Sequence, residues 1–211
     1  MDFSNAMGTQ FRDVRDIEHD GQPARAVEGS RVFATDIDDL WNALTDPERI
    51  ARWFPPVEGE FRLGGQYKIK GNASGTITGC EPPEALDLTW EFSGNVSWVS
   101  LRLAAEEDGA RLTLVHTMLK DEASEKHWAQ YGPGATGVGW DLSFLGLGMH
   151  LDSGGETVDQ NDSLAWLGTD EGKAFLRASA DTWGEAHIAA GEDAETAMAM
   201  AAKTASFYTG E

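Results

Sequence analysis

The residue with the clearest chemical potential in this sequence is His116. It stands between Leu114 and Met118 in a segment of alternating apolar and polar residues, so all three side chains are expected on the buried face of a strand. A histidine there can donate a hydrogen bond to a ligand, or serve as an acid or base inside a cavity. The simpler interpretation is a core histidine satisfied by neighbouring groups, and on the residues alone this second interpretation is better supported.

Large aromatic side chains form a second set that can do chemistry. For each of them alone, plain core packing is the simpler interpretation. Together, and opposite a glycine-rich apolar helix, they favour a pocket for a flat apolar ligand. We expect His116 to be the polar contact of this pocket, and its apolar wall to consist of Trp53, Trp90, Phe92, Trp140, Phe144 and Met149. Trp98 fits less well, because it is out of step with Leu101 and Leu103.

No motif of a known catalytic or cofactor site occurs in the sequence. Phosphate-binding, dinucleotide-binding, nucleophile-elbow and zinc-protease patterns are all absent. The five histidines are too dispersed to suggest metal ligands, and the single cysteine, Cys80, cannot form an internal disulfide or a cysteine metal site. We therefore predict no catalytic residue, no metal and no cofactor.

Asp141 is a carboxylate in a helix that should be enclosed. It could be a perturbed acid or a ligand anchor. The alternative, which we favour from the sequence, places it in the first turn, where its charge suits the helix dipole. His127 and Tyr131 lie in a short polar helix over 121–131 that can act as a lid, although both residues can equally be ordinary surface groups.

Periodicity predicts an α+β chain. Short alternating segments separated by Gly, Pro and Asn breaks predict an antiparallel meander over 66–70, 75–80, 85–92, 96–103 and 111–118. Asp36 or Asp38 can cap a helix before this meander, and Asp46-Pro47 begins another. After it, residues 138–151 predict a helix that is apolar nearly all round and must be enclosed. Its glycines permit close approach to the sheet, or leave room for something bound.

Three parts of the chain are expected. Residues 1–29 are polar and predict a loose or weakly paired leader, with a helix around 11–17 as one option, and residues 30–155 predict the main domain. Residues 156–211 predict a helical extension whose helices, 170–190 and 193–208, can form an antiparallel hairpin. The second of these is rich in Ala and Met and must bury a face, so a homodimer or a protein partner through 170–208 is plausible.

Several short motifs resemble one family. Residues 41–48 (WNALTDPE), followed by Arg52-Trp53-Phe54, resemble the opening signature of relatives of the activator of heat-shock protein 90 ATPase, in the START-like (SRPBCC) superfamily. Residues 61–67, 79–90 and Gly139-Trp140 resemble later steps of the same pattern, and the resemblance covers about residues 30–152. The tail, 183–209, resembles an extension of actinobacterial members.

That resemblance implies a helix-grip fold, in which an antiparallel sheet wraps around a long C-terminal helix. It implies no single activity, because members bind hydrophobic small molecules, cyclise polyketides or assist chaperones. Our leading hypothesis is a domain that binds an apolar or amphipathic small molecule between sheet and helix and has no enzymatic activity. The alternatives are a protein-interaction or co-chaperone-like module, and a cyclase- or hydrolase-like enzyme that uses His116.

The charge narrows the choice of partners. With 36 acidic and 16 basic residues the formal net charge is −20, which disfavours nucleic acid and anionic membrane surfaces. No apolar run is long enough to span a bilayer, and no signal peptide is visible. With one cysteine as well, these features predict a cytoplasmic protein.

Overall fold

The computed structural model describes residues 10–211. Over this range the chain forms eight strands and seven helices, and it divides into two compact units. One unit contains residues up to 29 together with 118–142 and 161–211; the other contains residues 30–117 and 143–160. The chain passes from one unit to the other at four points, after residues 29, 117, 142 and 160.

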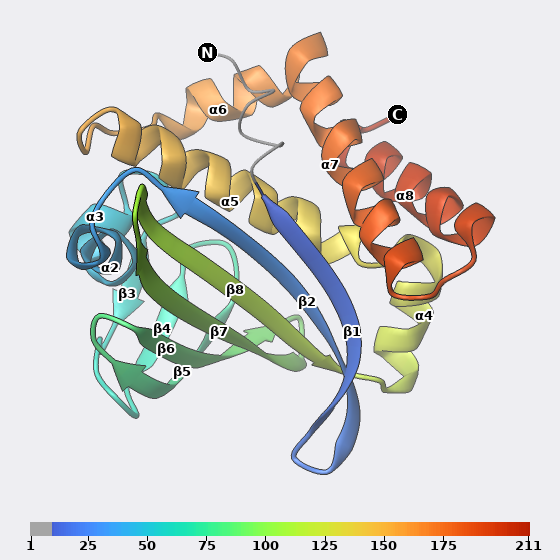
Figure 1. Cartoon of the computed structure of the whole chain (residues 1–211), viewed down its shortest axis with the longest axis horizontal. Helices are drawn as coiled ribbons and strands as arrows, with labels where there is room; N and C mark the ends of the chain where they lie inside the picture. Colours follow the sequence, from blue (N-terminus) through green and yellow to red (C-terminus); the bar gives the residue numbers. More distant parts are fainter. Residues whose placement is uncertain (1–9) are drawn as a thin grey trace. The chain divides into compact units, whose positions relative to one another are not determined.

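The strands form a single sheet in the order β1-β2-β8-β7-β6-β5-β4-β3 (Figure 1). The pairs from β3 to β8 are antiparallel. The strand bounds are β1 Phe11–His19, β2 Gln22–Phe33, β3 Val57–Gly59, β4 Gln66–Ile69, β5 Ser74–Glu81, β6 Ala85–Phe92, β7 Asn95–Glu106 and β8 Gly109–Leu119. All five strands of the predicted meander are confirmed, as β4 to β8, with ends shifted by three residues at most.

The helix predicted around 11–17 is wrong, and the rest of the described leader is paired and not loose. Residues from Phe11 onward form the hairpin β1–β2, not a helix, while residues 1–9 lie outside the described residues. The turn is Asp20-Gly21, with φ of 49° and 75°, a pair that favours a tight hairpin. Charged residues of the two strands pair across it, as Arg15 does with Glu28 at 2.8 Å. High polarity therefore reflects an ion-paired strand face and not a loose segment.

Two short helices follow β2 within the second unit. Helix α2 (Ile37–Thr45) begins at Asp36, whose carboxylate accepts a hydrogen bond from the Asp39 amide. Helix α3 (Pro47–Ile50) begins at Asp46, whose carboxylate accepts from the amides of Glu48 and Arg49. Both predicted caps are confirmed, and they satisfy amides that a helix start leaves without partners.

Helix α5 (Gly134–Asp152) is longer than predicted and extends four residues further toward the N-terminus. Two of its glycines permit close approach. A Cβ atom on Gly137 would lie 2.1 Å from the Trp183 ring, and one on Gly146 would lie 2.9 Å from the Trp53 carbonyl oxygen. In the second unit, the C-terminal half of α5 packs on the sheet, because the rings of Phe144 and Phe33 meet edge to face at 6.1 Å. This is the helix-grip arrangement, in an α+β fold.

The two predicted C-terminal helices are confirmed within the first unit, as α7 (Asp170–Ala189) and α8 (Ala194–Thr209). Helix α6 (Gln160–Leu167), which the sequence analysis did not predict, comes before them, and the predicted helix over 121–131 is α4 (Glu122–Tyr131). Helices α7 and α8 form an antiparallel pair (Figure 1), with Gly184 against Met198 and Ala201. The Thr204 hydroxyl donates to the Tyr131 carbonyl at 2.7 Å, so α8 buries this face against its own unit. None of the described helices is long and apolar enough to cross a membrane.

Candidate functional site

The candidate site lies on the inner face of strands β6, β7 and β8, in the second unit. The register aligns Leu88 with Val99 and His116 across the three strands, and Leu86 with Leu101 and Leu114. This confirms the face on which the sequence placed His116. Trp90 and Ser97 form the next pair of β6 and β7 on the same face.

Burial changes along this face. At one end Leu86, Leu101 and Leu114 are buried. Toward the β6–β7 turn Leu88, Trp90 and Ser97 are only half-buried, and Phe92 is 52% exposed. The apolar face is therefore closed at the Leu86 end and accessible at the Trp90 end.

His116 lies where the closed and accessible parts meet. Its side chain is buried, at 7% exposure, and its Nε2 atom lies 2.8 Å from the Ser97 hydroxyl. The Trp90 ring meets the imidazole edge to face, with ring centres 6.0 Å apart. Burial lowers the pKa of His116 from 6.5 to about 4, so the imidazole is neutral at physiological pH.

The hydrogen bonds around Ser97 define one arrangement of its proton. The Ser97 hydroxyl has the Trp90 carbonyl as an acceptor at 3.1 Å. Because a hydroxyl has one proton to give, a Ser97 that donates to this carbonyl accepts the His116 hydrogen bond, and the His116 proton is then on Nε2. A serine used as a nucleophile needs the opposite direction, with its proton given to the histidine. In the first arrangement the pair is a polar contact and not an activated nucleophile.

The remaining predicted site residues are distributed over several elements. Phe144 is 2% exposed on α5, and Met149, on the same half of that helix, is half-buried. Trp53 follows α3 and donates its indole N–H to the Ala43 carbonyl at 3.1 Å. Trp140 is half-buried in the part of α5 that belongs to the first unit.

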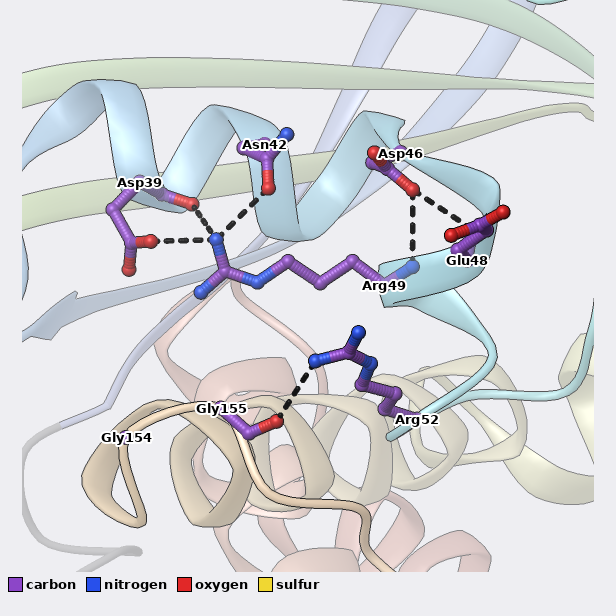
Figure 2. Close-up of a pocket in the computed structure, with 8 residues that line it drawn as sticks. All are labelled: Asp39, Asn42, Asp46, Glu48, Arg49, Arg52, Gly154 and Gly155. Carbon is purple, nitrogen blue, oxygen red and sulfur yellow. Dashed lines mark hydrogen bonds and ion pairs between the residues drawn. The ribbon is translucent and has the colours of Figure 1, made fainter.

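A polar cleft of about 340 Å³ forms a second feature of this unit (Figure 2). The Arg49 guanidinium bonds to the Asp39 carboxylate and, at 3.0 Å, to the Asn42 amide oxygen. Its Nε donates to His150 Nε2 at 3.1 Å, and the His150 Nδ1–H donates to the Glu156 carbonyl at 2.7 Å. The sequence analysis missed this network, although Asp39 and Asn42 stand three apart on one helix face. Its charges are largely matched internally, so it fastens α2 and α3 to the end of α5.

Asp141 lies at the centre of a buried cluster in the first unit. Our first-turn interpretation is wrong, because α5 begins at Gly134 and Asp141 occupies its third turn at 2% exposure. The carboxylate accepts hydrogen bonds from Gln10, from Arg12 (2.9 and 3.2 Å), from the Ser179 hydroxyl and from the Trp183 indole (3.2 Å). Burial raises the pKa of Asp141, while Arg12 acts to lower it. These hydrogen bonds join β1, α5 and α7 through one carboxylate.

Comparison with known proteins gives a family and a fold. The family model described as "Activator of Hsp90 ATPase homolog 1-like protein" matches residues 34–151, more than half of the chain. No curated protein matches the chain.

The similar solved structures include CalU16 from Micromonospora echinospora. Its crystal structure is 29% identical to this chain, the match covers 84% of this chain and 97% of CalU16, and the TM-score is 0.66. Its solution structure is 28% identical, the match covers 87% of this chain and 98% of CalU16, and the TM-score is 0.70. Protein MLL2253 from Mesorhizobium loti is 22% identical over 61% of this chain and 98% of its own, with a TM-score of 0.53, and shows the fold alone. CalU16 covers a larger share of this chain than the family model does.

Proposed function

The chain belongs to the family of activator of Hsp90 ATPase homolog 1-like proteins, with a START-like fold, and from this premise we propose that it binds an apolar or amphipathic small molecule. The ligand lies on the inner face of β6, β7 and β8, at its accessible end. His116 and Ser97 supply the polar contact, and Trp90 and Phe144 supply apolar surface. Trp53, Phe92 and Met149, which belong to the same unit, stay predicted members of the apolar wall, whereas Trp140 belongs to the first unit and is not assigned to this site.

One observation carries this proposal: a neutral His116–Ser97 pair at the half-buried end of an otherwise apolar sheet face. Binding sites for small molecules combine apolar walls with a few polar groups that fix orientation. The Ser97 oxygen gives one proton and accepts one, so it keeps a lone pair for a ligand hydroxyl or N–H. The neutral imidazole holds that serine in place and adds no charge of its own at this end of the face.

The two alternatives have less support. An enzyme that uses His116 as a base would need a proton donor directed at the ring, whereas the Ser97 proton points to the Trp90 carbonyl. A protein-interaction role through 170–208 predicts an apolar outer face on the tail. Instead α8 buries Ala197, Ala201 and Thr204, although Phe207 is 68% exposed beside Tyr131.

A thermal-shift screen against apolar metabolites tests the proposal. A ligand that binds only the native state raises the melting temperature by mass action. We expect at least one such ligand, and its shift should fall markedly in His116→Gln. The matched control is His127→Gln, which changes an exposed histidine on α4.

The three possible outcomes separate the hypotheses. A shift that falls in His116→Gln and persists in His127→Gln supports binding at the inner face. A shift that persists in both variants would place the ligand elsewhere. If no apolar compound shifts the native protein at high concentration, the binding proposal fails.

A further inference from the structure

Arg31 is a cation on the inner face without an acidic partner. It lies in β2 two residues before Phe33, so the two side chains share a face, and its guanidinium lies over the Phe33 ring at 5.1 Å. Because Phe33 meets Phe144 of α5, that face is the one turned toward the helix. Arg31 is therefore on the ligand-binding side of the sheet.

None of the nitrogens of Arg31 makes a hydrogen bond or an ion pair with any described residue. Its Nε atom is completely buried and has no acceptor. The side chain as a whole is half-buried, so the outer end of the guanidinium keeps accessible surface. Burial lowers the pKa of Arg31, and Asp152 at the end of α5 acts to raise it without contact. An unpaired cation in such a place is costly.

The other arginines show that this is unusual for the chain. Eight of the ten arginines, all of which lie within residues 10–211, form an ion pair with a carboxylate, and Arg31 and Arg52 do not. Arg52 donates to the Gly155 carbonyl and is exposed. The chain has 36 acidic and 16 basic residues, so a shortage of carboxylates does not explain why Arg31 lacks an ion pair.

Gly148 brings α5 close to this guanidinium. A Cβ atom on Gly148 would lie 3.3 Å from Nη2 and 3.4 Å from Nη1 of Arg31, which is a tight contact. A larger side chain at this position of α5 would press on both nitrogens and cover the surface that they keep. The glycine therefore lets the helix and the arginine lie side by side without a side chain between them.

We propose that Arg31 binds the anionic group of the ligand, a carboxylate or similar oxyanion, so that the ligand is an amphipathic anion and not a neutral hydrophobe. This inference rests on the proposed function, because it names the chemical class of the molecule bound at the same sheet face. A guanidinium presents two parallel N–H groups that match the two oxygens of a carboxylate. The oxyanion of the ligand is then the ion-pair partner that no described residue provides for Arg31.

Two fluorescent probes with the same apolar body test the inference. 8-Anilino-1-naphthalenesulfonate carries an anion, and N-phenyl-1-naphthylamine is its neutral counterpart. Each probe is titrated into the native protein, into Arg31→Met and into the control Arg111→Met. The control also removes one arginine charge, that of Arg111 on β8, which forms an exposed ion pair with Glu106. Arg31→Lys keeps the charge but loses the two-pronged geometry.

We expect the native protein and Arg111→Met to bind the anionic probe about tenfold or more tightly than the neutral one. Arg31→Met should lose this preference while its affinity for the neutral probe is kept, which also shows that the variant is folded. Arg31→Lys should keep part of the preference. If Arg31→Met keeps the full preference, the inference fails and the proposed function stands. If the native protein binds neither probe, both fail.

Discussion

Two ionisable groups in this molecule, one buried and one half-buried, are built in opposite ways. Asp141, in the first unit, receives hydrogen bonds from four side chains of the chain itself. Arg31, on the inner face of the second unit, lies over the Phe33 ring and is influenced by the Asp152 carboxylate without contact. Its Nε atom has no hydrogen-bond acceptor. A buried charge that the protein satisfies itself holds elements together, whereas one left unsatisfied has a cost that a ligand can remove.

The largest effect should come from removing the satisfied carboxylate. Asp141→Ala leaves the Arg12 guanidinium buried without its partner, so we expect it to lower the free energy of unfolding by roughly 3–5 kcal/mol. The measurement is urea unfolding, with exposed Asp181→Ala on α7 as the control. The double variant Arg12→Met with Asp141→Leu removes both charges and fills the space with apolar side chains. It should recover much of the stability that Asp141→Ala loses. Equal stability of Asp141→Ala and Asp181→Ala would contradict the role given to this cluster.

The next effect is a pH dependence from His116. Its pKa is lowered to about 4 in the folded chain, so the unfolded chain binds this proton at higher pH. Its contribution to stability is present above about pH 6.5 and is lost as the pH falls toward 4, for a total of roughly 3 kcal/mol. The difference between the native protein and His116→Gln, followed by urea unfolding from pH 7 to 4, isolates this group. Parallel curves would show that His116 is not buried as described.

A smaller loss is expected from Ser97→Ala. This change leaves the His116 Nε2–H without its acceptor, and an unsatisfied buried donor costs about 1–2 kcal/mol. Ser100→Ala, three residues further along β7 and on the opposite face of the sheet, is the matched control. Urea unfolding of the two variants gives the comparison. A loss no larger than that of the control would mean that the serine is not the partner of the histidine.

The smallest effect has the opposite sign. In the absence of ligand, Arg31→Met should raise the free energy of unfolding by about 1 kcal/mol, because it replaces an unpaired buried cation by an apolar side chain of similar length. Arg111→Met, which removes an exposed ion pair, should change it by no more than about 0.5 kcal/mol. Thermal unfolding of both variants is sufficient. Destabilisation by Arg31→Met would show that the chain itself satisfies the arginine.

Most of the sheet and the helices could be predicted from the sequence. Alternation and turn residues gave β4 to β8, and the acidic caps gave α2 and α3, because these signals act over a few neighbouring residues. The first hairpin was missed for a physical reason. Its strands carry ion pairs such as Arg15–Glu28, so their polarity imitates that of a loose segment.

The candidate site was only partly accessible to the same reasoning. Periodicity placed His116 on the buried face, because the alternation of residues within one strand is enough to assign its faces. It could not supply Ser97, which meets His116 through the pairing of β7 with β8, nor the distant donors of Asp141, such as Ser179. Arg31 was overlooked because a charged residue in a strand is usually solvated, and only the close approach of Gly148 shows otherwise.

The most direct test of the central claim is the nitrogen NMR spectrum of the histidine rings, recorded with and without N-phenyl-1-naphthylamine. His116 lies on the proposed binding face, whereas His150 is bonded to Arg49 and the Glu156 carbonyl away from it. We expect the ring nitrogens of His116, with the proton on Nε2, to shift on addition of the probe while those of His150 stay in place. Unchanged His116 signals in the presence of bound probe would contradict binding at this sheet face.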